Sequence, residues 1–343
     1  MEGREIKNME EFAEVSGISR PTLSKYFQDP DSVRQSTRKR VERALQIYDY
    51  RPNIFAINQN RKLTRTIGIV VPNLADPVFA EIAWSIERRC LEAGYRAALF
   101  GSHGDSKGEV DALDSLQALR PSGVLIAPLG RLSNKDYIAQ FCEKVPTVLF
   151  DRDIDEVGEA FVGSDNASFI NQSVEYLTRT GEAPCFFEVK NPANPNSIAR
   201  RLGYKKAMEA LGLEPVFVQV DDEGWEFERI GYEGGISAIE NRKFPTNTVL
   251  CSNDRLAIGF LAACYEKGLR VGRGKGCAMR VAGHDDHPQA RYTCPTLTTV
   301  AHEYGNVSNC GVKTLFELIE AGGRFDQRRA TLFPARLALR ESA

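Results

Sequence analysis

The chain has 343 residues, of which 42% are hydrophobic, and its formal net charge is −2. This length exceeds one ordinary domain, and the apolar content is sufficient to bury a core. No apolar run approaches the length of a membrane span and the first residues form no apolar signal region, so we expect a cytoplasmic protein without a membrane partner. The eight cysteines include no CxxC pair, which argues against a zinc cluster or a disulfide framework.

The first predicted elements are two short helices separated by Gly17. Apolar residues follow a helical period up to Ile18, and Ser19 is a good N-cap for the second helix. That helix would bury Leu23 and present short polar groups and cations, which suits a helix that contacts base edges in the major groove. The residues expected to face DNA are Ser19, Arg20, Pro21, Thr22, Ser24 and Lys25, with Pro21 limited to apolar contact with a thymine methyl.

A third predicted helix, over residues 36–48, is strongly basic. The cations of this helix are expected to contact phosphates rather than bases: Arg38, Lys39, Arg40 and Arg43. Thr37 is a further expected DNA contact. Residues 1–65 hold 13 Lys and Arg against 9 Asp and Glu, so positive charge is concentrated in this part of an otherwise acidic chain. DNA binding is one interpretation of these residues. A small helical bundle with a solvated basic face is the other.

The segment after Tyr50 begins with Pro52 and reaches the basic run 61–65 after a stretch too short to form a stable helix alone. With the two helices before it, this segment resembles the LacI/GalR (lactose/purine repressor) family of bacterial transcription regulators. The resemblance rests on FAEVSGISRPTLSKYFQDP, VRQSTRKRVERALQIYDYRPN and TRTIGIVVPNLADPVFAEI.

This resemblance implies a helix-turn-helix headpiece over 1–51, a hinge helix and linker over 52–65, and an effector-binding and dimerisation core over 66–343. In that family, paired hinge helices enter the minor groove at the operator centre. The DNA-contacting positions that it adds are Met9, Asn53, Ala56 and Gln59. Gln59 stands where the family usually has a leucine wedge, so we expect weaker bending or a different central base step.

From residue 66 onward, apolar runs alternate with amphipathic stretches, which is typical of parallel sheets covered by helices. The predicted strands are 66–71, 97–100, 123–127, 147–150, 185–189, 216–220, 248–251 and 280–283. The predicted helices include 78–93, 108–119, 170–180, 198–211, 230–242 and 256–267. The expected fold is α/β: an all-α headpiece followed by two doubly wound subdomains of the periplasmic-binding-protein type. The resemblance divides the core into an N-subdomain (66–163 and 297–325) and a C-subdomain (164–296 and 326–343).

Ligands bind such folds at the carboxyl ends of the strands, and candidate groups stand there. The predicted effector-binding residues are Asp76, Phe79, Asp151, Arg201, Trp225, Asn253 and Asp285. Arg201, Asn253 and Asp285 match the family's usual positions. Phe79 is equally explained as core, Asp76 as a helix cap, and Asp254 as a cap or structural acid.

The run His284–His287 contains two histidines and two carboxylates, but adjacent residues of an extended stretch alternate in direction, so no metal site is predicted. Motifs for serine hydrolases, P-loops and zinc proteases are missing, so we expect neither an enzyme nor a cofactor.

The sequence therefore predicts a dimeric repressor that binds a roughly palindromic operator and responds to a small metabolite, preferably a sugar or sugar acid. A purine or nucleoside effector, a solute-binding protein and an α/β enzyme of sugar or nucleoside metabolism are the alternatives.

Overall fold

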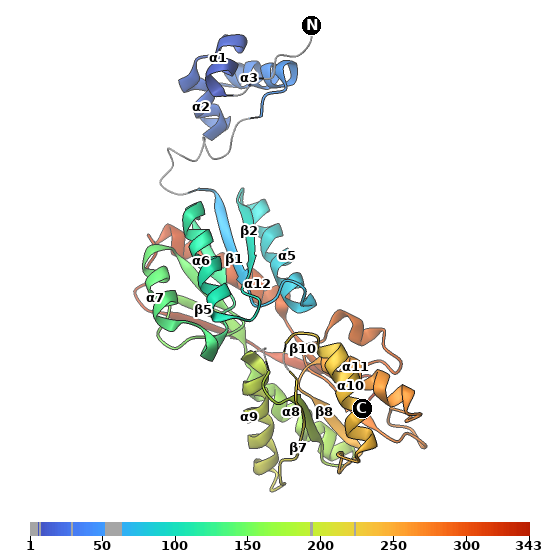
Figure 1. Cartoon of the computed structure of the whole chain (residues 1–343). Coiled ribbons are helices and arrows are strands. Elements are labelled where there is room, and N and C mark those ends of the chain that lie inside the picture. Colours follow the sequence, from blue (N-terminus) through green and yellow to red (C-terminus); the bar gives the residue numbers. More distant parts are fainter. Residues whose placement is uncertain (1–5, 7, 29, 52–63, 193–194, 223) are drawn as a thin grey trace. The chain divides into compact units, whose positions relative to one another are not determined.

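The chain divides between Thr64 and Arg65 into two units (Figure 1). The structure, a computed structural model, describes residues 6, 8–28, 30–51, 64–192, 195–222 and 224–343. Within the described helices, none is long and apolar enough to cross a membrane.

The first unit is a small helical headpiece. It contains α1 (Met9–Ser16), α2 (Arg20–Gln28), a 3-10 turn (Pro30–Ser32) and α3 (Gln35–Tyr48). The Asn8 side chain caps α1 by accepting from the Glu11 amide at 2.9 Å, and Gly17 ends that helix with a φ of +64°. Phe12 and Leu23 are fully buried, and Tyr50 stacks on Phe12 at 4.5 Å between ring centroids. This core fixes which face of α2 remains exposed.

The N-subdomain of the second unit contains a six-stranded parallel sheet in the order β11-β5-β4-β3-β1-β2. Its strands are β1 (Thr66–Val71), β2 (Arg96–Gly101), β3 (Gly123–Ile126), β4 (Thr147–Phe150), β5 (Ala160–Ser164) and β11 (Arg329–Phe333). Helices α5 (Pro77–Glu92) and α12 (Tyr304–Glu320) pack on one face, and α6 (Ser106–Leu119) and α7 (Lys135–Lys144) on the other. A 3-10 turn (Gly130–Leu132) precedes α7.

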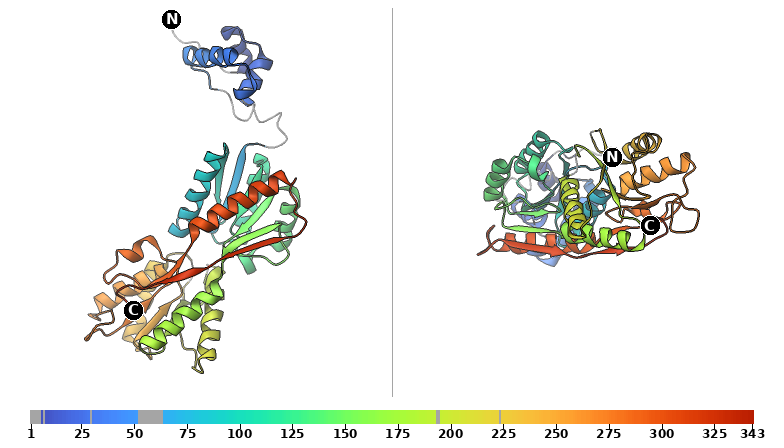
Figure 2. Two further views of the ribbon diagram at one scale, coloured as in Figure 1. Left: turned by 180° about the vertical axis from the view of Figure 1, so that it is seen from behind. Right: turned by 90° about the horizontal axis from the view of Figure 1, so that it is seen from below.

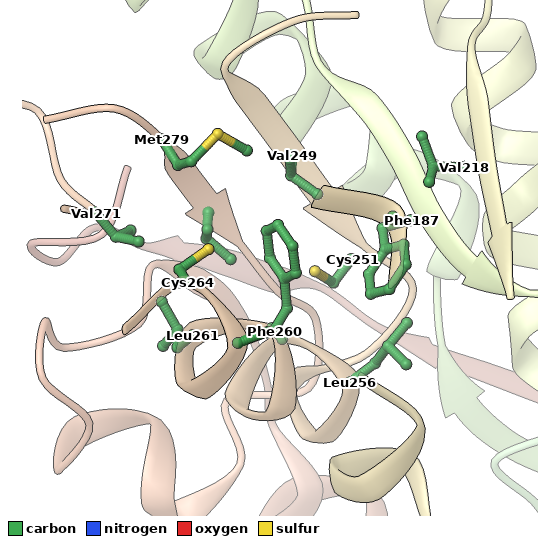
Figure 3. Packing of buried hydrophobic residues seen from close by; sticks show 14 of the residues in the cluster. Phe187, Val218, Val249, Cys251, Leu256, Phe260, Leu261, Cys264, Val271 and Met279 are labelled. Atoms are coloured by element: carbon green, nitrogen blue, oxygen red, sulfur yellow. The ribbon is translucent and has the colours of Figure 1, made fainter. Parts of the chain in front are cut away.

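The C-subdomain contains a four-stranded parallel sheet in the order β7-β6-β8-β9. Its strands are β6 (Cys185–Val189), β7 (Phe217–Val220), β8 (Thr248–Cys251) and β9 (Arg280–Ala282). Helices α8 (Asn166–Thr180) and α9 (Pro195–Ala210) cover one face, and α10 (Phe227–Glu240) and α11 (Asp254–Glu266) the other, before a 3-10 turn at Pro288–Arg291. In Figure 3, Leu256 and Phe260 of α11 pack beside Phe187, Val249 and Cys251 of the sheet. This contact holds the start of α11 at the sheet's carboxyl edge.

The chain passes between the subdomains at three places, the second and third of which lie later than expected. Strand β10 (Thr299–His302) pairs antiparallel with β12 (Ala335–Ala338), and Ala282 and Asp285 bridge to this segment, so both strands continue the C-subdomain. Strand β11, in contrast, pairs with β5 in the N-subdomain. Figure 2 shows α12 and this returning strand running along the N-subdomain.

The N-subdomain therefore takes residues 304–333 rather than 297–325, and the C-subdomain resumes at 335 rather than 326. Strand pairing decides these limits, and β10 and β11 carried too weak a local pattern to be predicted. The α/β fold class itself is confirmed, and the eight predicted strands lie within about two residues of observed ones.

Candidate functional site

The exposed face of α2 carries the residues expected to contact bases. Leu23 is buried, whereas Ser19, Arg20, Pro21 and Lys25 are exposed. The Ser19 and Thr22 hydroxyl oxygens lie 2.8 Å apart, which orders the first turn. Arg20 forms an exposed ion pair with Glu10 at 2.9 Å, so this guanidinium would have to exchange a weak partner for DNA. Ser24 and Thr22 are partly buried.

Three of the other expected DNA contacts belong to the same helical unit, and the remaining three fall outside the described residues. Arg38 binds two carboxylates, Asp31 at 2.5 Å and Glu42 at 3.0 Å, and this raises its pKa. Thr37 and Met9 are partly buried in the same unit. The hinge predictions at Asn53, Ala56 and Gln59 fall outside the described residues.

In the core, polar side chains gather where strands of both subdomains end. Arg200, on α9, is buried and donates both to the Ser252 carbonyl at 2.9 Å and to the two carboxylate oxygens of Asp285, which follows β9. Tyr304 donates to Asp285 at 3.4 Å. Burial raises the pKa of Asp285, and the Arg200 charge opposes this change. An arginine held by its planar fork offers a fixed edge for hydroxyl or carboxylate groups.

Asp151 faces the same cluster from the N-subdomain. Its Oδ2 accepts from the Asn196 amide at 2.8 Å, so this contact joins the two subdomains. Burial raises the pKa of Asp151 to about 6, and the Arg200 charge acts in the opposite direction. Arg200 thus interacts with two carboxylates: it donates hydrogen bonds to Asp285, and it attracts Asp151 electrostatically over a longer distance.

Arg201, the arginine that the sequence pattern indicated, points elsewhere. Its Nε binds the buried Glu188 at 2.7 Å, and its Nη2 donates to the Lys190 carbonyl at 2.9 Å. Neighbouring helical residues differ in direction by about 100°. The choice between two adjacent arginines therefore depends on how α9 packs, and packing turns Arg200 toward Asp285.

Two buried imidazoles lie beside Asp285. The rings of His284 and His302 are 4.9 Å apart, and none of their four nitrogens has a hydrogen-bond partner among the described residues. Burial lowers the pKa of His302 to about 3 and that of His284 well below its ordinary value, so both rings are neutral at pH 7. A neutral imidazole offers one donor and one acceptor, as a hydroxyl group requires.

His284, Asp285 and His302 also offer ligand atoms within 4.8 Å of one another, the spacing of a metal site. Arg200 already occupies both Asp285 oxygens, and its charge would repel a cation. His287 lies apart, with its Nδ1 accepting from the Gln289 amide, as alternation along the strand predicts. The arrangement therefore suits an uncharged polar ligand better than a metal ion.

Phe79 and Trp225 meet edge to face at 6.4 Å, with Phe79 buried in the N-subdomain core. Asp76 caps α5 by accepting from the Val78 amide at 3.0 Å, and it also pairs with Arg255. Phe79 is thus a core residue and Asp76 a helix cap, which are the structural alternatives that the sequence left open. Each side chain also contacts a residue of the C-subdomain.

Asn253 and Asp254 begin α11. Asn253 is the N-cap, accepting from the Leu256 amide at 2.8 Å, and its buried Nδ2 has no partner among the described residues. Asp254 is the structural acid: its carboxylate accepts from the Thr299 hydroxyl at 2.6 Å and from the His287 amide at 2.7 Å. The Asn253 amide is thus available to a ligand, and Asp254 is not.

Comparison with known proteins decides the family. Residues 8–53 match the model of bacterial regulatory proteins of the lacI family, and residues 176–343 match the periplasmic binding protein-like domain. The HTH-type transcriptional repressor PurR of Histophilus somni (strain 129Pt) is 25% identical over 93% of this chain and 94% of its own length. The ribose operon repressor of Escherichia coli (strain K12) is 26% identical over 96% and 98%.

The chain belongs to the lacI family. Its fold agrees, because the Lac repressor bound to ONPG superposes with a TM-score of 0.82 at 23% identity over 99% of this chain and 100% of the other. The chain is therefore a DNA-binding transcription regulator with an effector-binding core, as predicted, and its family consists of regulators rather than enzymes.

Three residues of the central cluster of this lacI-family core were not predicted from the sequence: Arg200, His302 and Tyr304. Arg200 carried a signal, since it stands beside Arg201 in a helix that starts after a polar loop. His302 and Tyr304 lie about twenty residues from Asp285 along the chain, and only the pairing of β10 places them there. That pairing could not be predicted from local pattern.

Proposed function

We propose that this regulator is a cytoplasmic, dimeric repressor whose cleft binds a carbohydrate-like effector and thereby changes the affinity of the headpiece for a roughly palindromic operator. The observation that carries the proposal is the cluster of Arg200, Asp285, His284 and His302. The cluster contains buried polar atoms that have no hydrogen-bond partner among the described residues, and the same chain carries a helix-turn-helix headpiece.

On the DNA side, α2 reads base edges and the start of α3 meets phosphates. The base-reading set is Ser19, Arg20, Pro21, Thr22, Ser24 and Lys25, with Met9, Thr37 and Arg38 beside it. The hinge positions Asn53, Ala56 and Gln59 contact the minor groove at the operator centre. Two headpieces in a symmetric dimer explain a palindromic site.

On the effector side, ligand hydroxyls pair with the buried groups that lack a partner in the described part of the chain. Arg200 and Asp285 form a donor and acceptor edge, the two imidazoles supply further donors and acceptors, and the Asn253 amide supplies another donor. An unsatisfied buried polar group costs about 1–3 kcal/mol, so several of them together favour a ligand rich in hydroxyls. The likeness to a ribose operon repressor supports the carbohydrate class.

A purine effector would need a planar slot between Phe79 and Trp225. These rings touch edge to face, which leaves no parallel gap for a base. The carbohydrate therefore remains the better candidate.

Effector binding is coupled to DNA through the contacts between the subdomains. Asp151 with Asn196, and Asp76 with Arg255, join the subdomains beside the cluster that takes the ligand. A ligand that prefers one arrangement of these contacts by about 1–3 kcal/mol shifts the protein toward that arrangement and so changes its affinity for the operator. Operator DNA must then change the affinity for the ligand by the same factor. Induction and corepression use the same residues.

The test begins with selection of bound duplexes from a random pool by the full-length protein, with the double variant Arg20→Ala, Lys25→Ala as control. We expect a palindromic site that the variant no longer selects. Operator titration with a panel of sugars then follows. If every ligand that binds the core leaves operator affinity unchanged, the coupled mechanism is wrong.

A further inference from the structure

A cavity of about 600 Å³ opens between the subdomains next to the Arg200 cluster. Its walls come from the N-subdomain (His103, Arg131, Arg152) and from the C-subdomain (Lys190, Arg201, Trp225). The cavity shares two chain segments with the cluster, because Arg152 directly follows Asp151 and Arg201 directly follows Arg200. Asp151 and Arg200 of the cluster are therefore chain neighbours of two residues in the cavity wall.

The lining of the cavity is cationic on both sides. It includes three arginines and a lysine, and no carboxylate belongs to it among the described residues. Arg131, Arg152 and Lys190 form no ion pair within the part of the chain that the structure describes, whereas Arg201 is neutralised by Glu188. The Asp151 charge partly offsets that of Arg152, but the cations still face one concave space and repel one another, and an anion placed among them lowers this repulsion.

From this lining we propose that the effector is a polyol carrying a phosphate group, with the phosphate in the cavity and the hydroxyls at the Arg200 cluster. The inference rests on the proposed carbohydrate effector and specifies its charge. A phosphate monoester carries up to two negative charges and three acceptor oxygens, which match Arg131, Arg152 and Lys190 in charge and in donors. A neutral sugar would bring no negative charge to these cations.

Trp225 provides the means to test the proposal. The chain contains two tryptophans, and the other one, Trp84, is exposed on α5 outside the cavity. In a Trp84→Phe protein, fluorescence therefore reports on the cavity wall alone. Inorganic phosphate, titrated against chloride at constant ionic strength, is the first probe. We expect a saturable change in Trp225 emission with phosphate and none with chloride.

The second step compares ribose 5-phosphate, glucose 6-phosphate and fructose 6-phosphate with the unphosphorylated sugars and with gluconate. The sugar phosphate that binds should do so at least roughly tenfold more tightly than its neutral counterpart, as expected for charge-assisted contacts. Lys190→Gln and Arg131→Gln should each weaken phosphate binding by roughly tenfold. Lys206→Gln, which removes the same charge from an exposed position of α9 outside the cavity, should leave it unchanged.

Several results would overturn the assignment. One is the absence of any saturable response to phosphate, and another is equal loss in Lys190→Gln and Lys206→Gln. Equal or tighter binding of gluconate would show that the anionic group of the effector is a carboxylate and not a phosphate. If a neutral sugar releases the operator while phosphates do not bind, the phosphate inference fails and the proposed carbohydrate function stands. If no ligand of any charge affects the operator while phosphate still binds the cavity, the proposed function fails instead.

Discussion

Asp76 and Arg255 form an ion pair of 3.2 Å across the two subdomains, although 179 positions separate them in the chain. Asp76 also caps α5, while Arg255 lies in the first turn of α11 and binds Glu228 at 2.6 Å. Both members of the pair are mostly buried. Because each side chain stands at the start of a helix, the pair joins the first turns of α5 and α11 across the two subdomains.

Replacing Arg255 by Gln should lower the free energy of unfolding of the core by about 2 kcal/mol, since Asp76 loses a charged hydrogen bond in a poorly hydrated place. Urea unfolding, followed by tryptophan fluorescence, measures this loss. The matched control is Arg229→Gln, which removes ion pairs of an exposed arginine to Asp222, Glu226 and Glu233 and should cost less than about 1 kcal/mol. Equal losses in the two variants would contradict a special role for the Asp76 pair.

His284→Phe separates a ligand-binding role from a structural one. The variant removes two buried nitrogens that have no partner among the described residues, so it should raise the free energy of unfolding by about 1 kcal/mol. It should also abolish the response of operator affinity to the effector, because one donor and one acceptor for ligand hydroxyls are lost. Denaturation and operator titration on the same preparation measure both effects. A destabilised variant that still responds to ligand would assign His284 to packing alone.

The buried Asp254 should make the stability of the fold depend on pH, and its burial determines the sign of this dependence. Burial raises its pKa from 3.8 to about 7, so the folded chain holds a proton that the unfolded chain releases. The stability contributed by this group is therefore present below pH about 4 and is lost as pH rises to about 7. Between these limits, the free energy of unfolding of Asp254→Asn should rise by up to about 4 kcal/mol relative to that of the unaltered protein, because the amide stays uncharged at every pH.

The control for this experiment is Asp286→Asn. Burial acts to raise the Asp286 pKa, but the bonds from Arg340 and Arg291 lower it below its ordinary value. The stability that this carboxylate contributes is fully present above pH about 4 and is lost only as pH falls below that value, so Asp286→Asn should be less stable than the unaltered protein by a constant amount between pH about 5 and 8. Unfolding curves of all three proteins between pH 4 and 8 give the two differences. Differences of the same sign would show that local burial does not control these groups.

Gly104→Ala should disturb the cavity wall through Trp225. Gly104 has a φ of +73°, and a Cβ atom there would lie 2.5 Å from the Trp225 Nε1. Backbone strain costs about 1 kcal/mol, and the tryptophan must move in addition, which should shift its emission. Gly94→Ala is the control, since φ is +79° and the nearest atom to its Cβ would be the Arg65 Nη1 at 3.8 Å. That variant should be destabilised by strain alone, with unchanged Trp225 emission.

Local signals in the sequence were sufficient for the headpiece and for most of the core's order. Gly17, Ser19 and Leu23 define the α1–α2 turn within a few residues, so the exposed face of α2 follows from helical periodicity. Strands β1, β3 and β4 are buried on both faces and carry apolar runs, which predict them directly. Candidates at strand ends, such as Asp151 and Asp285, followed from the same pattern.

Only the tertiary structure decided which of these groups meet. Arg200 and Arg201 are equivalent in the sequence, and the packing of α9 turns one toward Asp285 and the other toward Glu188. His302 and Tyr304 reach the cluster through the pairing of β10, which depends on contacts distant in the chain. Sequence alone determined the family architecture because its signals are local. The effector site required the fold, because its residues come from segments distant in the chain whose contacts no local pattern encodes.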